Sequence, residues 1–106
     1  MEFRELEKRA MTIRVRYAEF EKAKSGAAWT NEELALGFVG DVGDVAKLVM
    51  AVNGRREIAN AREKLEHELA DCLWSVMVLA HAHEVDLERA FARAMDELEE
   101  RLSPND

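Results

Sequence analysis

The sequence predicts an all-α protein of four helices that pack as a bundle. The single proline, Pro104, lies near the end of the chain, so no helix before it is interrupted by proline. Apolar residues recur at alternating spacings of three and four, which is the helical period. Gly26 and Gly54 fall between such stretches and mark the ends of helices.

The first helix is predicted over residues 2–24 and ends near Ser25 and Gly26. Its apolar stripe consists of Phe3, Leu6, Ala10, Ile13, Tyr17 and Phe20. The second helix is predicted to begin after Thr30, because Thr30 and Glu33 have the spacing of a capping box, and to end at Asn53 and Gly54. Glycines inside this helix, Gly40 and Gly43, lower its stability and therefore indicate either close helix packing or the approach of a bound phosphate.

The third helix is predicted from about Ile58 to His83, and its half after Asp71 is apolar on most sides, which indicates a central position. Asp86 is the predicted cap of a fourth helix over residues 87–102, which ends at Ser103 and Pro104. Residues 1–102 are thus expected to form one domain, followed by a short tail over 103–106.

The composition limits the partners of this chain. Its 22 acidic and 15 basic residues give a formal net charge of -7, which opposes binding to nucleic acid polymers and to anionic membranes. Met1–Leu6 mixes charged and apolar residues, unlike a signal peptide, and a lone Cys72 suits a reducing compartment, so we expect a cytoplasmic protein. A chain of 106 residues is marginally stable alone, which favours a homodimer or homotetramer.

Four carboxylates form the most informative motif. Asp41 and Asp44 make one pair, Glu68 and Asp71 make another, and both pairs lie inside apolar helical stretches. Residues three apart share a helix face, so each pair directs two carboxylates to one point. Like charges held together need a cation, and hard oxygen ligands suit Mg²⁺ or Mn²⁺. All four residues are therefore candidate metal ligands, and one of them is expected to activate a water molecule.

The order and spacing of these pairs resemble the MazG-like nucleoside triphosphate pyrophosphohydrolases. Residues 36–46 (LGFVGDVGDVA) are similar to the family's Leu-x-x-Val-Gly-Glu-Val-Gly-Glu-Leu-Ala run. Residues 68–73 (ELADCL) and 85–90 (VDLERA) are similar to its Glu-Leu-Ala-Asp-Val-Leu and Ile-Asp-Leu-Glu-Glu-Ala segments. The resemblance implies an oligomeric helical enzyme that cleaves nucleoside triphosphates to a monophosphate and pyrophosphate, with magnesium bound by the four carboxylates.

The sequence also departs from the family pattern. The family usually has glutamates where Asp41 and Asp44 stand, so here the ligands are one methylene shorter. Ala51 and Ser75 replace aromatic residues often found in the base pocket, and Trp29 stands where a histidine is common. The usual C-terminal Lys and Asn are replaced near Ala94, Glu97 and Leu98.

Several residues near the motif have two interpretations. Trp29 is a candidate for stacking on a nucleobase, but a residue just before a helix cap more often packs on the first turn, and we favour that interpretation. Trp74 and Cys72 are expected to lie in the core. The basic residues Lys47, Arg55 and Arg56 are candidates for contacting phosphate, although charges at helix ends are more often only solvated.

Two functions remain open from the sequence. The favoured one is an Mg²⁺-dependent enzyme that hydrolyses (deoxy)nucleoside triphosphates, in keeping with removal of unwanted nucleotides. The alternative is a non-catalytic helical module that binds nucleotide or a protein. All four carboxylates are present, which favours the enzyme, whereas the shortened ligands and the altered pocket favour the module.

Overall fold

The computed structural model describes residues 1–104 and contains four α-helices and no strand in that part of the chain. The helices are α1 (Phe3–Ser25), α2 (Asn31–Val52), α3 (Ala61–Ala82) and α4 (Leu87–Leu102). The predicted all-α class and the number of helices are confirmed. Of the tail predicted over residues 103–106, Asn105 and Asp106 lie outside the described residues.

Local capping fixes most of the helix ends. The Thr30 hydroxyl accepts a hydrogen bond from the Glu33 N–H at 3.1 Å, and the Glu33 carboxylate accepts one from the Thr30 N–H at 2.9 Å, which confirms the capping box. At α4, Asp86 accepts a hydrogen bond from the Arg89 N–H at 3.2 Å. Gly26 ends α1 in the left-handed conformation with a φ of 88°.

The predicted start of α3 near Ile58 is wrong, because the helix begins three residues later at Ala61. Asn60 has a φ of 55° and a ψ of 38°, a left-handed conformation that a right-handed helix cannot contain. Asn tolerates this conformation better than most residues do. Residues 53–60 therefore form a longer connection than the periodicity indicates.

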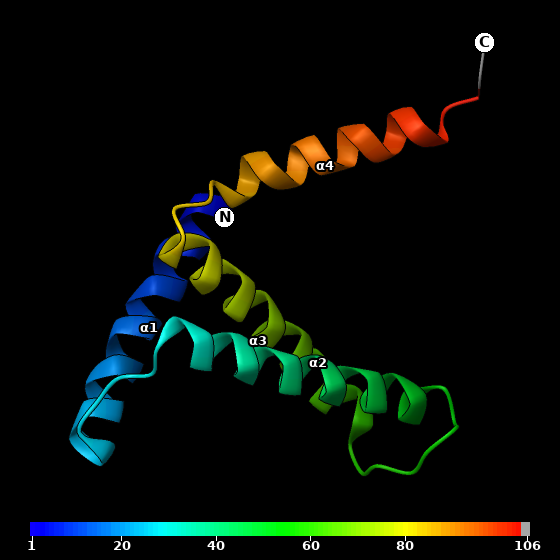
Figure 1. Cartoon of the computed structure of the whole chain (residues 1–106). Helices are drawn as coiled ribbons and strands as arrows, with labels where there is room; N and C mark the ends of the chain where they lie inside the picture. The colour runs from blue at the N-terminus through cyan, green and yellow to red at the C-terminus, as the bar shows by residue number, and fades with distance from the viewer. Residues whose placement is uncertain (105–106) are drawn as a thin grey trace.

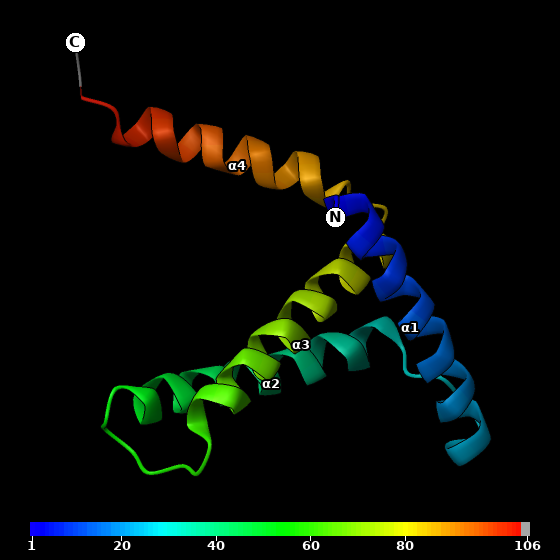
Figure 2. The ribbon, with the colours of Figure 1, turned by 180° about the vertical axis from the view of Figure 1, so that it is seen from behind.

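Helices α2 and α3 lie side by side and antiparallel, as Figures 1 and 2 show from opposite sides. Helix α1 packs across the C-terminal half of α3, whereas α4 extends away from the other three. Most buried residues belong to that half of α3, as predicted: Ser75, Met77, Val78 and Ala80. The two others in the described chain are Ala10 of α1 and Leu48 of α2.

One chain does not close its four helices around a single core. The radius of gyration is 17.1 Å, compared with roughly 13 Å for a compact domain of this length. The accessible surface is 8486 Å², whereas a monomeric protein of this mass has about 6000 Å². Helix α4 contains no buried residue, and its Phe91 is 62% exposed. Within the described residues, no helix is both long and apolar enough to cross a bilayer.

Candidate metal site and its aromatic cavity

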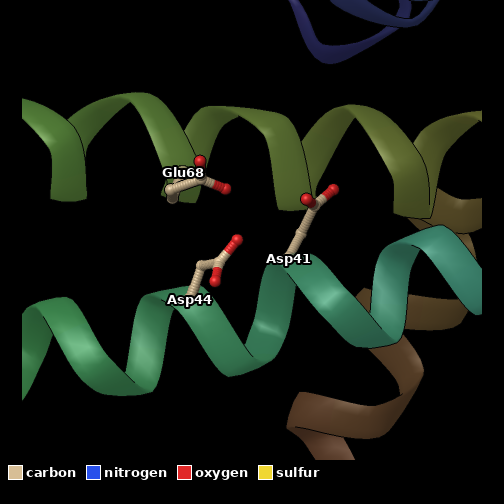
Figure 3. A group of neighbouring side chains, drawn as sticks. All are labelled: Asp41, Asp44 and Glu68. Carbon is tan, nitrogen blue, oxygen red and sulfur yellow. The ribbon is translucent and has the colours of Figure 1, made fainter.

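The antiparallel pairing of α2 and α3 brings three of the four predicted carboxylates together. Asp41 and Asp44 lie one turn apart on α2, and Glu68 faces them from α3 (Figure 3). One oxygen from each of the three residues lies within 4.8 Å of the others. This acidic cluster, defined as Asp41, Asp44 and Glu68, has the geometry expected of ligands that share one cation.

The electrostatics of the acidic cluster are unfavourable without a cation. Burial, followed by the nearby charges of Asp71 and Asp44, raises the pKa of Asp41 above its usual value. The pKa of Glu68 is also raised, first by burial and then by Asp41, Asp71 and Asp44, against a small opposing effect of His67. In addition, Oε2 of Glu68 is buried without a hydrogen-bond partner. A hydrogen-bonded acceptor is the rule at such a position, so this oxygen is suited to coordinate an ion.

The donor set fits a hard divalent cation. All three side chains of the cluster supply carboxylate oxygens, which Mg²⁺ and Mn²⁺ prefer over the nitrogen and sulfur ligands typical of zinc. The nearby thiol of Cys72 is half-buried, and burial together with the surrounding carboxylates raises its pKa, which keeps it protonated at neutral pH. Cys72 is not part of the acidic cluster.

Asp71, the fourth predicted ligand, takes a different position. Its carboxylate lies 3.2 Å from Nε2 of His67, one turn earlier on α3, and is not part of the three-residue cluster. It is nevertheless close enough to raise the pKa of both Asp41 and Glu68. His67 thus orients a neighbour of the cluster rather than joining it.

An aromatic cavity of about 420 Å³ adjoins the acidic cluster. Asp41 and Asp71 contribute to its wall, and the aromatic residues that line it are Tyr17, Trp29 and Trp74. Only Trp29 among these three was a candidate from the sequence. Tyr17 was assigned to a packing stripe and Trp74 to the core, because periodicity does not show that α1 and α3 leave space between them near the carboxylates.

Trp74 and Tyr17 are held in place by contacts between α1 and α3. The indole Nε1 of Trp74 donates a hydrogen bond to the Ala10 carbonyl at 3.1 Å. Its ring centre lies 5.9 Å from that of Tyr17 with an interplanar angle of 59°, a favourable tilted arrangement. Trp74 is half-buried, so one part of it packs in the core while another part faces the cavity.

Trp29 packs on the first turns of α2, as favoured from its position before the cap, and its stacking on a nucleobase stays a prediction. Its ring lies over α2, so close that a Cβ at Gly37 would be 3.2 Å from Cζ3 of the indole. It also lines the cavity together with Leu34, the residue that a hydrophobic staple contacts. Yet Trp29 remains 48% exposed, which leaves an aromatic surface available beside the acidic cluster.

The three basic candidates are not held against the carboxylates. Lys47 lies one turn beyond Asp44 on α2 and is exposed, and Arg55 and Arg56 are exposed in the connection before α3. In the described residues, none of the three forms an ion pair. Their side chains therefore remain free to meet a ligand, and their role in phosphate binding stays a prediction.

Comparison with known proteins assigns this chain to a family. Searches of curated proteins and of solved structures gave no significant match. A family model described as the MazG nucleotide pyrophosphohydrolase domain matches residues 29–104, which is well over half of the chain and includes both acidic pairs. On this match, which agrees with the spacing and the spatial meeting of the carboxylates, the chain belongs to the MazG nucleotide pyrophosphohydrolase family.

Proposed function

We propose that this protein hydrolyses (deoxy)nucleoside triphosphates to a monophosphate and pyrophosphate in the presence of Mg²⁺, with Mn²⁺ as a possible substitute. The observation that supports this most is the acidic cluster, in which Asp41, Asp44 and Glu68 from two helices converge within 4.8 Å. The buried, unpartnered Oε2 of Glu68 makes a purely structural role for the cluster costly. Removal of unwanted nucleotides is the physiological role we infer.

Asp41, Asp44, Glu68 and Asp71 would hold the metal in this proposal. When bound, magnesium neutralises phosphate charge and makes an attacking water more acidic. Asp41 and Asp71 line the aromatic cavity, so they would meet the substrate side of the site, while Glu68 and Asp44 do not line it. One of the four carboxylates accepts the proton of the attacking water. The aspartates at 41 and 44 place the charge closer to the α2 backbone than glutamates would.

The aromatic cavity is the proposed site of the nucleobase. An exposed indole face such as that of Trp29 can stack on any nucleobase, since every base has a planar aromatic face. Base–aromatic stacking is worth roughly 1–3 kcal/mol. Lys47, Arg55 and Arg56 are proposed to contact phosphate oxygens at the end of the α2–α3 pair where residues 53–60 connect the two helices. The net charge of -7 explains why a free nucleotide, bound through a metal, is a better ligand than a nucleic acid polymer.

We further propose that the chain, with residues 1–102 as its domain, works as a homodimer or homotetramer in the cytoplasm. Its surface exceeds that of a compact monomer of this mass by about 2500 Å², which is the amount that each subunit of a large obligate dimer buries. The unpaired α4 carries exposed apolar side chains, namely Phe91, Leu98 and Leu102. A groove of about 630 Å³ between α1 and the end of α3, remote from the carboxylates, includes the apolar Met11, Val15 and Val85.

A non-catalytic nucleotide- or protein-binding module is the alternative. The shortened ligands at positions 41 and 44 favour it, because a metal held less closely activates water less effectively. Such a module would bind a triphosphate with Mg²⁺ without releasing pyrophosphate.

A pyrophosphate-release screen over nucleoside triphosphates, with Mg²⁺ and with Mn²⁺, tests the proposal. The matched variant is Glu68→Gln, which keeps the side-chain volume and removes the charge of the unpartnered carboxylate. We expect metal-dependent release by the natural protein and loss of most of it in the variant. Binding of a non-hydrolysable triphosphate without any release would instead support the module.

A further inference from the structure

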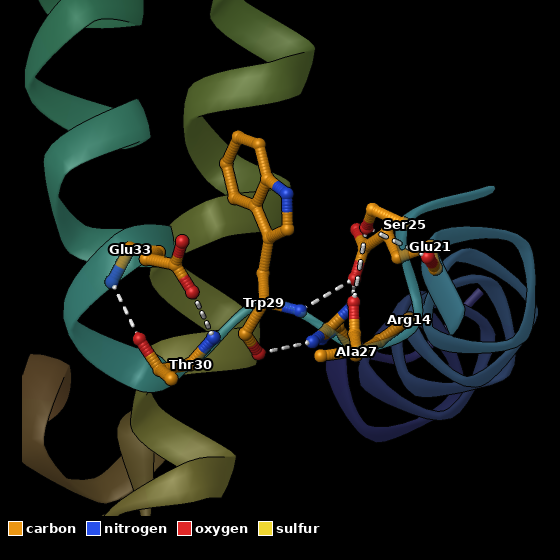
Figure 4. A network of polar contacts seen from close by, with 7 residues as sticks. All are labelled: Arg14, Glu21, Ser25, Ala27, Trp29, Thr30 and Glu33. Atoms are coloured by element: carbon orange, nitrogen blue, oxygen red, sulfur yellow. Dashed lines mark hydrogen bonds and ion pairs between the residues drawn. The ribbon is translucent and has the colours of Figure 1, made fainter.

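Trp29 lies in the segment between α1 and α2, and an ion pair from α1 binds both its main-chain N–H and its main-chain carbonyl. Glu21 accepts a hydrogen bond from the Trp29 N–H at 2.8 Å, and Arg14 donates one to the Trp29 carbonyl at 2.9 Å. Arg14 and Glu21 also pair with each other at 3.2 Å. We call these three contacts the Trp29 clamp; Figure 4 shows them, with the indole pointing away from the two charged side chains.

The two charged side chains of the clamp, which both belong to α1, are less exposed than those of the ion pairs that connect α1 to the start of α4. The side chains of Arg14 and Glu21 are 12% and 15% exposed, whereas those of Arg4 and Asp86 are 69% and 52% exposed. Shielded, charge-assisted hydrogen bonds hold geometry more firmly than surface pairs, which water and salt weaken. Since residues 26–30 lie outside any helix, the main chain of Trp29 has no other regular support.

The indole is constrained from the opposite side by α2. Gly37 is the one described helical glycine whose added Cβ would meet a neighbour, and that neighbour is Cζ3 of Trp29 at 3.2 Å. Gly37 therefore leaves room for the ring, and a Cβ there would force the ring to shift by a few tenths of an ångström. The clamp fixes the main chain of Trp29, and α2 limits the position of its ring. The orientation of the indole is therefore constrained at both ends of the residue.

This arrangement is more than packing requires. If the ring served only as a staple, its burial would supply the stabilisation, but Trp29 stays 48% exposed while the two charged side chains that hold its main chain are largely withdrawn from water, and one of them, Glu21, also lines the cavity. The part of the ring that stays open belongs to the cavity that Asp41 and Asp71 also line. A rigid aromatic surface next to a metal site loses little entropy when a planar ligand stacks on it.

We propose that Arg14 and Glu21 are positioning residues for nucleobase recognition, which hold the indole of Trp29 as a preset wall of the aromatic cavity. The inference rests on the proposed function for its ligand, a nucleotide, but the positioning itself is a property of the free protein. Neither residue belongs to the acidic cluster, so the clamp governs binding of the base and leaves the hydrolytic step unchanged.

The test measures the position of the Trp29 ring and the affinity for nucleotide in separate experiments. The chain has two tryptophans, so its ¹⁵N spectrum contains two indole N–H signals, and Trp29→Phe identifies which belongs to Trp29. Arg14→Met should move or broaden the Trp29 signal and leave that of Trp74 in place. Gly37→Ala should do the same from the other side without touching the ion pair, so the test survives if Arg14→Met fails to fold. The control is Arg9→Met, an equal change of charge at an exposed position of α1.

Binding is measured as the Kd of a non-hydrolysable triphosphate with Mg²⁺, and turnover as KM and kcat. Arg14→Met and Gly37→Ala should each weaken binding about five- to tenfold, with kcat changed less than twofold. This loss is part of the roughly 5- to 150-fold in affinity that a complete base–aromatic stack is worth. Arg14→Lys, which cannot reach both acceptors with a planar fork, should restore only part of the affinity. Arg9→Met should match the natural protein in every measurement.

Each outcome decides a separate point. An unmoved Trp29 signal in Arg14→Met shows that the clamp does not position the ring, and a moved signal with unchanged Kd shows that the position does not matter for the ligand; either result overturns the inference. Nucleotide binding without hydrolysis removes the proposed catalytic function but leaves the clamp supported if Kd changes as expected. A natural protein that binds no nucleotide removes both.

Discussion

Glu68→Gln should stabilise the protein when no divalent metal is present. The substitution removes one charge from the acidic cluster and breaks no hydrogen bond at Oε2, because that oxygen has no partner. Each carboxylate pair within 4.8 Å repels by about 1 kcal/mol even at the dielectric constant of water, and Glu68 faces two such neighbours. We therefore expect a gain of about 1–2 kcal/mol in the free energy of unfolding at pH 7, which raises Tm by roughly 4–16 °C.

The stabilisation produced by Glu68→Gln should be greater at neutral pH than at acidic pH. The pKa of Glu68 is raised above its ordinary 4.5 in the folded state, so protonation of Glu68 favours folding. In the natural protein, this contribution is fully present below pH 4.5 and is lost as the pH rises through the folded-state pKa. Glutamine resembles the protonated acid at every pH, so the difference between the two proteins should be largest at pH 7 and disappear near pH 4.

Thermal unfolding followed by circular dichroism, with EDTA and at one protein concentration, measures this difference at both pH values. Glu66→Gln is the control, because Glu66 is an exposed carboxylate on the same helix and lies outside the acidic cluster. A Glu68→Gln protein that is less stable than the natural one at pH 7 would refute the reasoning, as would a gain that persists undiminished at pH 4.

Four further predictions concern the metal site, the assembly and a helix cap. Asp71→Asn should keep the helical circular dichroism and lose most metal-dependent pyrophosphate release, and full activity would exclude Asp71 from the site. Millimolar Mg²⁺ should raise Tm more than NaCl of equal ionic strength, and this difference should vanish in the Asp41→Asn, Asp44→Asn double variant. Light scattering should give at least twice the 12.1 kDa of one chain, so a monomer mass at micromolar concentration would contradict the assembly. Thr30→Ala removes the α2 cap and should lower stability by about 1 kcal/mol, or about 4–8 °C in Tm.

The features that the sequence predicted correctly are those made by residues close together in the chain. The capping box at Thr30 and the cap at Asp86 depend on contacts three residues apart, and helical spacing alone placed the carboxylate pairs on common faces. The early start predicted for α3 failed because periodicity does not reveal the left-handed backbone at Asn60. The Trp29 clamp joins residues eight and fifteen apart through an irregular segment, and no local pattern indicates its path.

The separation of Asp71 from the other three carboxylates was also beyond the sequence. Spacing gives Asp71 the same relation to Glu68 that Asp44 has to Asp41, yet its side chain pairs with His67 instead. The choice between two partners one helical turn away depends on the side-chain rotamer, which the spacing leaves undetermined. For the same reason, the cavity wall formed by Tyr17 and Trp74 became visible only with α1 in place.

The acidic cluster is built entirely within the α2–α3 hairpin, whereas the wall of the aromatic cavity draws on α1. Helix α1 contributes Ile13, Tyr17 and Glu21 to that wall and lies outside the family match, which begins at residue 29 and includes the rest of the wall together with the acidic cluster. On the proposed function, substitutions in α1 should therefore change which base is accepted without replacing any of the proposed metal ligands. A library confined to residues 3–25 is the natural starting point for redirecting the preference of this protein among nucleotides.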